Sequence, residues 1–221
     1  MYMKNQKENI LQVATKLFYE QGYKNTYLDQ IAAICGITKP LITYYFKSKS
    51  NLAREVSERF LYEHKNRIAL KLYLEYFKEN PTDLQVSTAV EIRLYDMLHL
   101  YDPNVMRFVK EHADEKYEDT FSANKVRLYQ IHDRRYGLNL TRCPDEISMI
   151  ARAAIATSLS VKLAYANGEF NCSLEECLDY LTSAHFVLMH IDEKRINEII
   201  EESKYILEMI PFEIKPYFQV I

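Results

Sequence analysis

The chain has 221 residues, of which 48% are hydrophobic and 27% charged, values typical of a soluble globular protein, so intrinsic disorder and collagen-like repeats are not expected. Only 4 glycines and 6 prolines are present, which disfavours sandwiches and barrels with a tight turn every ten residues. The net charge of −3 is uneven, because residues 1–49 hold seven lysines against three acidic residues, leaving +4 there and −7 in the remainder. We therefore expect an all-α protein of about nine or ten helices with a basic amino-terminal end.

Three helices are predicted at the amino terminus. The first carries an apolar stripe and ends at Gly22; the stripe consists of Ile10, Val13, Ala14, Leu17 and Phe18. Thr26 is expected to cap the second helix, with Asp29 as its capping-box partner, and Gly36 to end it. Thr38 is expected to cap the third, with Pro40 in its first turn. Two short helices across a glycine turn form a helix-turn-helix, whose second helix enters the DNA major groove.

A long fourth helix is predicted next, capped by Ser48 or Ser50 and running to about Asn80. Further helices are expected over residues 82–101, 103–113, 114–137, 144–168, 173–191 and 193–210, with Ser173 and Asp192 as caps and Pro211 as a stop. This punctuation divides the chain into a helix-turn-helix domain, residues 1–48, and a helical ligand-binding and dimerisation domain, residues 49–221.

Residues 22–52 resemble the TetR family of bacterial transcriptional regulators. The resemblance lies in the run Gly22-Tyr23-(x2)-Thr26-(x4)-Ile31-Ala32-(x3)-Gly36-Ile37-Thr38-Lys39-Pro40-(x3)-Tyr44-Tyr45-Phe46-Lys47-Ser48-Lys49-(x2)-Leu52, and it covers about residues 5–65. It implies a cytoplasmic homodimer whose two amino-terminal domains bind the half-sites of a palindromic operator in double-stranded DNA. A helical body would form the dimer interface and bind an unknown small-molecule inducer. The family resemblance favours a repressor over an activator.

The same resemblance assigns DNA contacts residue by residue. Thr26 and Lys49 fall where the family touches phosphates, the alternatives being a plain cap for Thr26 and a solvated charge for Lys49. The positions that face the groove are Thr38, Lys39, Pro40, Leu41 and Thr43. Tyr44 and Tyr45 match positions that pack against sugar and phosphate, although either could instead pack in the three-helix core. Phe46 is expected in the core.

Two departures from the family pattern bear on the operator sequence. Leu41 replaces a small or polar residue, and Thr43 replaces the first aromatic residue of a pair. Both reach a thymine methyl group, and Lys39 is the one good donor to a base edge. We therefore hypothesise an operator that contains A·T pairs at the contacted positions.

The ligand-binding residues are predicted from aromatic and histidine side chains in the body. Tyr95 and His99 share a helical face, being four residues apart, and the complete predicted set is Tyr95, His99, Phe121, Tyr129 and Tyr165. The alternative is that these are ordinary core side chains. The late helices fill the monomer core or build the dimer interface.

No catalytic, metal, cofactor or membrane role is expected. The chain lacks a nucleophile elbow, a Gly-rich phosphate loop and an HExxH sequence, so we predict no enzyme and no cofactor. Cys172 and Cys177 are five residues apart, a spacing that does not place two metal ligands on one helical face. The amino terminus lacks the apolar run of a secretory signal, and Arg152 and Lys162 interrupt the apolar stretch 149–166, which argues against a membrane span.

A second class of function is a protein-interaction adaptor whose helix-turn-helix does not bind DNA. Lys39, Lys49 and the local charge of +4 discriminate between the two, because an adaptor has no electrostatic reason to keep them.

Overall fold

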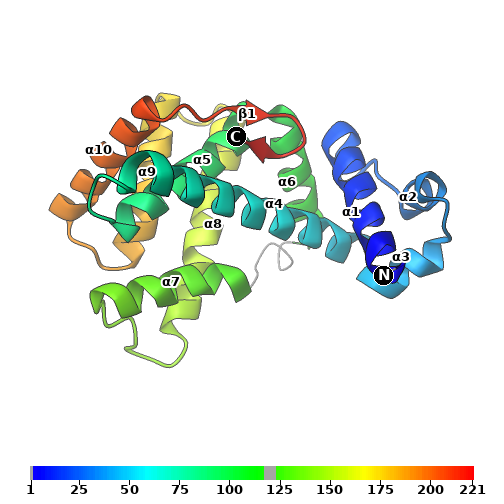
Figure 1. Ribbon diagram of the computed structural model, residues 1–221, viewed down its shortest axis with the longest axis horizontal. Helices are drawn as coiled ribbons and strands as arrows, with labels where there is room; N and C mark the ends of the chain where they lie inside the picture. The colour runs from blue at the N-terminus through cyan, green and yellow to red at the C-terminus, as the bar shows by residue number, and fades with distance from the viewer. Residues whose placement is uncertain (1, 117–122) are drawn as a thin grey trace. The chain divides into compact units, whose positions relative to one another are not determined.

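The computed structural model describes residues 2–116 and 123–221, and these form ten α-helices (Figure 1). The helices are α1 (Tyr2–Gln21), α2 (Leu28–Cys35), α3 (Lys39–Phe46), α4 (Lys49–Leu72), α5 (Leu84–Tyr101), α6 (Pro103–Lys116), α7 (Ala123–Tyr136), α8 (Glu146–Ala166), α9 (Leu174–Leu188) and α10 (Glu193–Met209). A π-helical turn, η1 (Tyr73–Phe77), continues α4, and two short strands, β1 (Ile214–Lys215) and β2 (Gln219–Val220), pair near the carboxy terminus. The predicted all-α class is confirmed.

The chain divides into two compact units. The head unit comprises Met1–Glu63, Tyr101–Thr120 and Ile214–Gln219, and the body unit comprises His64–Leu100, Phe121–Glu213 and Val220–Ile221. The chain therefore enters the head unit three times, and α4 begins in the head unit and ends in the body unit. The domain boundary expected between residues 48 and 49 stays a prediction.

The core of the head unit forms around the apolar stripe of α1. Ile10, Ala14 and Phe18 are fully buried, and α1 packs against α2 and α6. The ring of Phe18 lies 5.8 Å from Tyr23 and 5.4 Å from Phe108 of α6, measured between ring centroids. Because α2 and α3 are each only eight residues long, they depend on this packing for stability.

Residues Ile214–Gln219, which follow α10, belong to the same head unit. Phe218 is 5% exposed, and its ring lies 5.6 Å from Tyr19, 5.6 Å from Phe60 and 5.3 Å from Phe108. The hydroxyl of Tyr217 donates a hydrogen bond of 2.8 Å to Glu20. The sequence correctly predicts that α10 stops before Pro211, but it gives no indication of the hairpin that follows.

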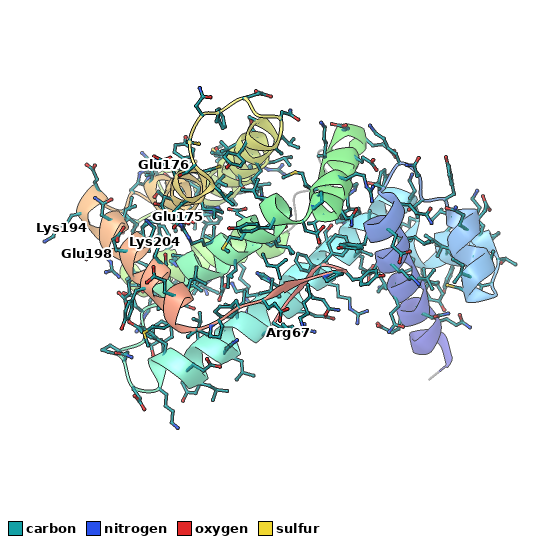
Figure 2. All side chains as sticks on the ribbon, turned by 90° about the horizontal axis from the view of Figure 1, so that it is seen from above. Arg67, Glu175, Glu176, Lys194, Glu198 and Lys204 are labelled. Carbon is teal, nitrogen blue, oxygen red and sulfur yellow. The ribbon has the colours of Figure 1, made fainter. Side chains whose placement is uncertain are left out.

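In the body unit, α8 packs against α7 and α9, and α9 packs against α10. Buried Arg93 of α5 forms ion pairs with Glu175 and Asp179 of α9, and Lys204 of α10 lies 2.7 Å from Asp179. Figure 2 shows Glu175 on α9 and Lys204 on α10. Among the described residues, α8 alone is long and apolar enough by composition to cross a membrane, yet only 22% of its most apolar window is buried within the chain.

Several helix boundaries differ from the prediction. The N-cap of α2 is Tyr27 and not Thr26, and the Gln30 side chain, not that of Asp29, accepts a hydrogen bond from the Tyr27 N–H. The helix expected to end at residue 113 continues to Lys116, because the sequence there holds no helix breaker. Of the two serines considered for α4, Ser48 is the cap, since its hydroxyl accepts the N–H of Asn51 at 3.0 Å.

Candidate nucleic-acid interface and ligand site

The turn between α2 and α3 is built on Gly36, which has φ of +65°, a conformation that residues with a Cβ adopt only with strain. The N–H of Ile37 donates to the Ala32 carbonyl at 3.0 Å and closes the end of α2. Thr38 occupies the predicted N-cap position of α3 with extended backbone angles, but its hydroxyl makes no capping hydrogen bond. The inward faces of the two helices bury Ile31, Ala32, Ile42 and Phe46. The opposite face of α3 is thus left without cover from α2.

The outer face of α3 carries the side chains predicted to meet the DNA groove. Thr38, Lys39, Pro40, Thr43 and Tyr44 are exposed, and Leu41 and Tyr45 are half-buried. Tyr44 is 70% exposed, whereas the ring of Tyr45 lies 6.3 Å from the buried Phe46. Of the two tyrosines, Tyr45 is therefore the one with a packing role, and Tyr44 projects outward.

Lys39 forms an exposed ion pair with Asp29 of α2. The distance between Lys39 Nζ and Asp29 Oδ2 is 2.9 Å, and the two side chains are 51% and 71% exposed. Exposed pairs of this kind contribute about 0.2 to 1 kcal/mol. The ammonium group of Lys39 is therefore held near the start of α3 by an interaction weak enough to be exchanged for a base edge or a phosphate.

The two predicted phosphate contacts differ in accessibility. The side chain of Thr26 is fully buried, and its hydroxyl donates to the Gly22 carbonyl at 2.7 Å, so it supports the turn between α1 and α2. Lys49 is half-buried, its Nζ donating to the Tyr23 carbonyl at 3.1 Å and lying 4.1 Å from the Tyr23 ring centroid. Lys49 is therefore oriented by Tyr23 and keeps a charge at the surface, whereas Thr26 has no exposed atom to offer a phosphate.

The predicted ligand residues fall into two groups in the body unit. Tyr95 and His99 do contact each other, with ring centroids 4.3 Å apart, and the ring of His64 lies 6.0 Å from Tyr95. Burial raises the pKa of Tyr95, so its hydroxyl stays protonated. Tyr129 instead pairs with His185, its hydroxyl lying 2.8 Å from Nδ1 of that histidine.

Of the other two predicted ligand residues, one is on α8 and one falls outside the described chain. Tyr165 is half-buried near the end of α8. Phe121 lies outside the described residues. No group of three or more histidine, cysteine or acidic side chains that could hold a metal ion occurs within residues 2–116 and 123–221.

A buried ion pair near Tyr95 was missed at the sequence level. Asp96 of α5 and Lys162 of α8 lie 2.7 Å apart, with side chains 2% and 5% exposed. The signal that could have found it is a lysine in the most apolar stretch of the chain, where a charge is costly unless it is paired. Its partner is 66 residues away in sequence, so the pairing itself could not be predicted.

Comparison with known proteins agrees with this geometry. The family model for bacterial regulatory proteins of the tetR family matches residues 10–56, which include α2, the turn and α3. The HTH-type transcriptional regulator AcrR of Shigella flexneri is 42% identical over 52 residues, or 24% of each chain. Residues 10–56 of the chain belong to the TetR family.

Other relatives extend the similarity beyond the helix-turn-helix. YerO of Bacillus subtilis, described as an uncharacterized HTH-type transcriptional regulator, is 24% identical over 181 residues, which are 79% of this chain and 61% of YerO. The chain thus spans less than two thirds of the curated relatives it matches. The crystal structure of RolR in complex with resorcinol has a TM-score of 0.61 at 14% identity, covering 97% of this chain and 98% of that one. This likeness shows that the two proteins share their fold over nearly the whole chain.

The end of α1 and the turn before α2 are held in place by α6, in contacts that sequence reasoning missed. The guanidinium of Arg107 donates to the carbonyls of Tyr19 and Glu20 at 3.0 and 2.9 Å, at the end of α1. Glu111 accepts the N–H of Lys24 at 2.7 Å, in the turn before α2. No local pattern signals these contacts, because they join segments about 87 residues apart in sequence.

Proposed function

We propose that the protein is a ligand-responsive transcriptional regulator that binds a palindromic operator in double-stranded DNA and is released by a small-molecule inducer. The observation that carries the proposal is the outer face of α3, where Lys39, Thr43 and Tyr44 are exposed on a helix whose other face is buried. A short helix in this position presents its amino-terminal residues to base edges. The role is that of a cytoplasmic repressor and not of a catalyst.

We propose that the DNA contacts are made by the accessible residues of the helix-turn-helix. Thr38, Lys39, Pro40, Leu41 and Thr43 face the groove, with Leu41 and Thr43 on thymine methyl groups. Tyr44 and Lys49 contact the sugar-phosphate backbone. Thr26 is left out, because its hydroxyl is committed to Gly22, and Tyr45 contributes through its packing on Phe46.

We further propose that the protein acts as a homodimer through the outer faces of α8 and α9. The most apolar window of α8 has a mean hydropathy of 1.4, and Met149 of α8 is 59% exposed. On α9, Tyr180 and Val187 are 59% and 58% exposed and lie seven residues apart on one face. Apolar helices with an uncovered face associate in two-fold dimers. A Tyr180→Glu variant is expected to sediment as a monomer, and an unchanged dimer would exclude this interface.

An inducer-responsive body is supported by the similarity to the TetR family and by the likeness to RolR, which was crystallised in complex with its ligand resorcinol. In a dimer, the two heads would read half-sites roughly 34 to 36 Å apart, and an inducer acts by favouring a conformation with another separation. The coupling free energy required is typically about 1 to 3 kcal/mol. The α4 helix is the continuous element through which such a change would pass, because it belongs to both units.

The test is the selection of bound sites from random duplex DNA with the purified full chain. A palindromic sequence with A·T pairs at the contacted positions is expected. Half-sites made of G·C pairs without thymine at those positions would overturn the assignment of Leu41 and Thr43. Failure of a folded protein to enrich any sequence would favour the adaptor, and transcription assays with and without the operator distinguish a repressor from an activator.

A further inference from the structure

The Asp96 carboxylate is incompletely satisfied by the protein that surrounds it. Its Oδ1 atom accepts hydrogen bonds from Lys162 Nζ at 2.7 Å and from the Ser158 hydroxyl at 3.3 Å. Its Oδ2 atom is buried and accepts no hydrogen bond from the described part of the chain. A buried ion pair stabilises a fold only when its remaining hydrogen-bonding capacity is used, so stability alone does not account for this arrangement.

The ion pair lies beside an aromatic side chain and a neutral thiol. Lys162 Nζ lies 5.2 Å from the ring centroid of Tyr95, which in turn contacts His99. Burial raises the pKa of the Cys177 thiol on α9 to about 11, and the Asp96 charge contributes to the shift, so this neighbour is neutral as well. Asp96, Lys162, Tyr95 and Cys177 together therefore carry one positive charge and one negative charge beside an aromatic ring.

This arrangement selects one kind of ligand group. Asp96 Oδ2 is a free acceptor, and the ammonium of Lys162, on the other oxygen of the same carboxylate, is a donor with three N–H bonds. A hydroxyl group both donates and accepts, whereas a carboxylate only accepts and an ammonium only donates. A charged ligand would also leave a net charge buried at the site, which is costly.

We propose that Asp96 and Lys162 bind the hydroxyl group of an uncharged small molecule whose apolar or aromatic body packs beside Tyr95. This inference rests on the proposed ligand-responsive function and names the chemical class of the inducer. The hydroxyl donates to Asp96 Oδ2 and accepts from Lys162 Nζ. Ser158 is a positioning residue, because its hydroxyl holds Oδ1 of the same carboxylate.

The sequence predicts Tyr129 as a ligand residue, but in the structure its hydroxyl pairs with His185, so the site proposed here does not include it and the pair serves as a control within the same unit. The polar groups of these two side chains are 2.8 Å apart, so each is already satisfied by the other. Both Tyr129 and Tyr95 carry a hydroxyl whose pKa burial raises. A Tyr129→Phe variant removes a buried polar atom from the unit without touching the Asp96 carboxylate.

The experiment measures binding of four matched probes to the DNA-free full chain by ligand-observed NMR. The probes are phenol, toluene, benzoate and benzylammonium, which share a ring and differ in their polar group. The wild type and Tyr129→Phe are expected to bind phenol at least about tenfold more tightly than the other three. A double variant, Asp96→Asn with Lys162→Met, is expected to lose this preference, while near-ultraviolet circular dichroism shows that it remains folded, because a neutral pair replaces the charges.

Three results would overturn the proposal: toluene, benzoate or benzylammonium binding as tightly as phenol, the double variant binding phenol like the wild type, or no binding of phenol by the wild type. Operator binding is measured separately on the same preparations without any probe. If the wild type without any probe does not bind the operator, the regulator function itself is wrong. That result is separate from a failure of phenol to bind, so the failure of the proposed function and the failure of the proposed ligand class can be distinguished.

Discussion

Replacing Phe218 by alanine tests whether the carboxy-terminal hairpin stabilises the head unit. The ring is 5% exposed and contacts the rings of Tyr19, Phe60 and Phe108. Truncating a buried phenylalanine to alanine costs about 3 to 5 kcal/mol, including the cavity that is left. Because Phe218 lies in a short two-stranded hairpin and not in a helix, we expect a loss at the lower end of this range, about 3 kcal/mol, limited to the head unit.

Hydrogen exchange measured peptide by peptide is the suitable assay, because the chain has no tryptophan and a global unfolding curve would mix the two units. For Phe218→Ala, amides in α1 and α6 are expected to exchange faster by about two orders of magnitude, while those in α8 and α9 are unchanged. An Ile221→Ala variant is the control, because this terminal side chain is 42% exposed. Unchanged protection of α1 would refute the reasoning.

Three further changes have defined outcomes. Gly22→Ala is expected to destabilise the head unit by about 2 kcal/mol, measured by hydrogen exchange of the α1 amides, because φ is +82° and the new Cβ would lie 2.5 Å from Glu111 Oε2. Burial lowers the pKa of His64 to about 4. The unfolded chain therefore binds more protons than the folded chain between pH 6.5 and 4, and the free energy of unfolding should fall by up to about 1.4 kcal/mol per pH unit on acidification. Asp29→Asn releases Lys39 and removes a negative charge beside the DNA-facing helix, so operator affinity is expected to rise about two- to fivefold.

Each of these three predictions has a control variant. Gly36→Ala also has a positive φ, but no atom lies within 4 Å of its new Cβ, so a cost equal to that of Gly22→Ala would show that the Glu111 contact is unimportant. In a His64→Gln variant, the fall in the free energy of unfolding that is due to His64 should disappear. If the variant and the wild type show the same dependence of stability on pH, the acid sensitivity comes from other groups. Glu201→Gln makes the same charge change on an exposed ion pair of α10, and an equal gain in operator affinity there would rule out a local effect of Asp29.

The helices of this protein could be predicted because their signals are local. Gly22 and Gly36 end α1 and α2 with positive φ, and the capping box at Ser173 is present, with the Glu176 carboxylate accepting the Ser173 N–H at 2.7 Å. The predicted N-cap of α2 is wrong by one residue. The hydroxyl of Thr26 can either cap the helix or donate to a nearby carbonyl, and in the folded chain it donates to Gly22.

Contacts between distant segments could not be predicted in the same way. The hairpin that places Phe218 against Tyr19 joins the two ends of the chain, and nothing in the sequence after Pro211 marks its destination. Helical periodicity and the family resemblance together predicted which face of α3 is accessible. The partners of Lys39 and Lys49 depend on how α2 and the preceding turn pack, which only the structure provides.

The most direct test of the central claim is a salt titration of binding to the selected operator, carried out with the wild type and Lys39→Ala. If Lys39 reads a base edge, the wild type should bind with a steep inverse dependence on salt, and the variant should lose about 1 to 3 kcal/mol of affinity together with sequence preference at one position of each half-site. Equal affinity and equal preference in the two proteins, or binding that does not change with salt, would contradict the account of α3 as the recognition helix.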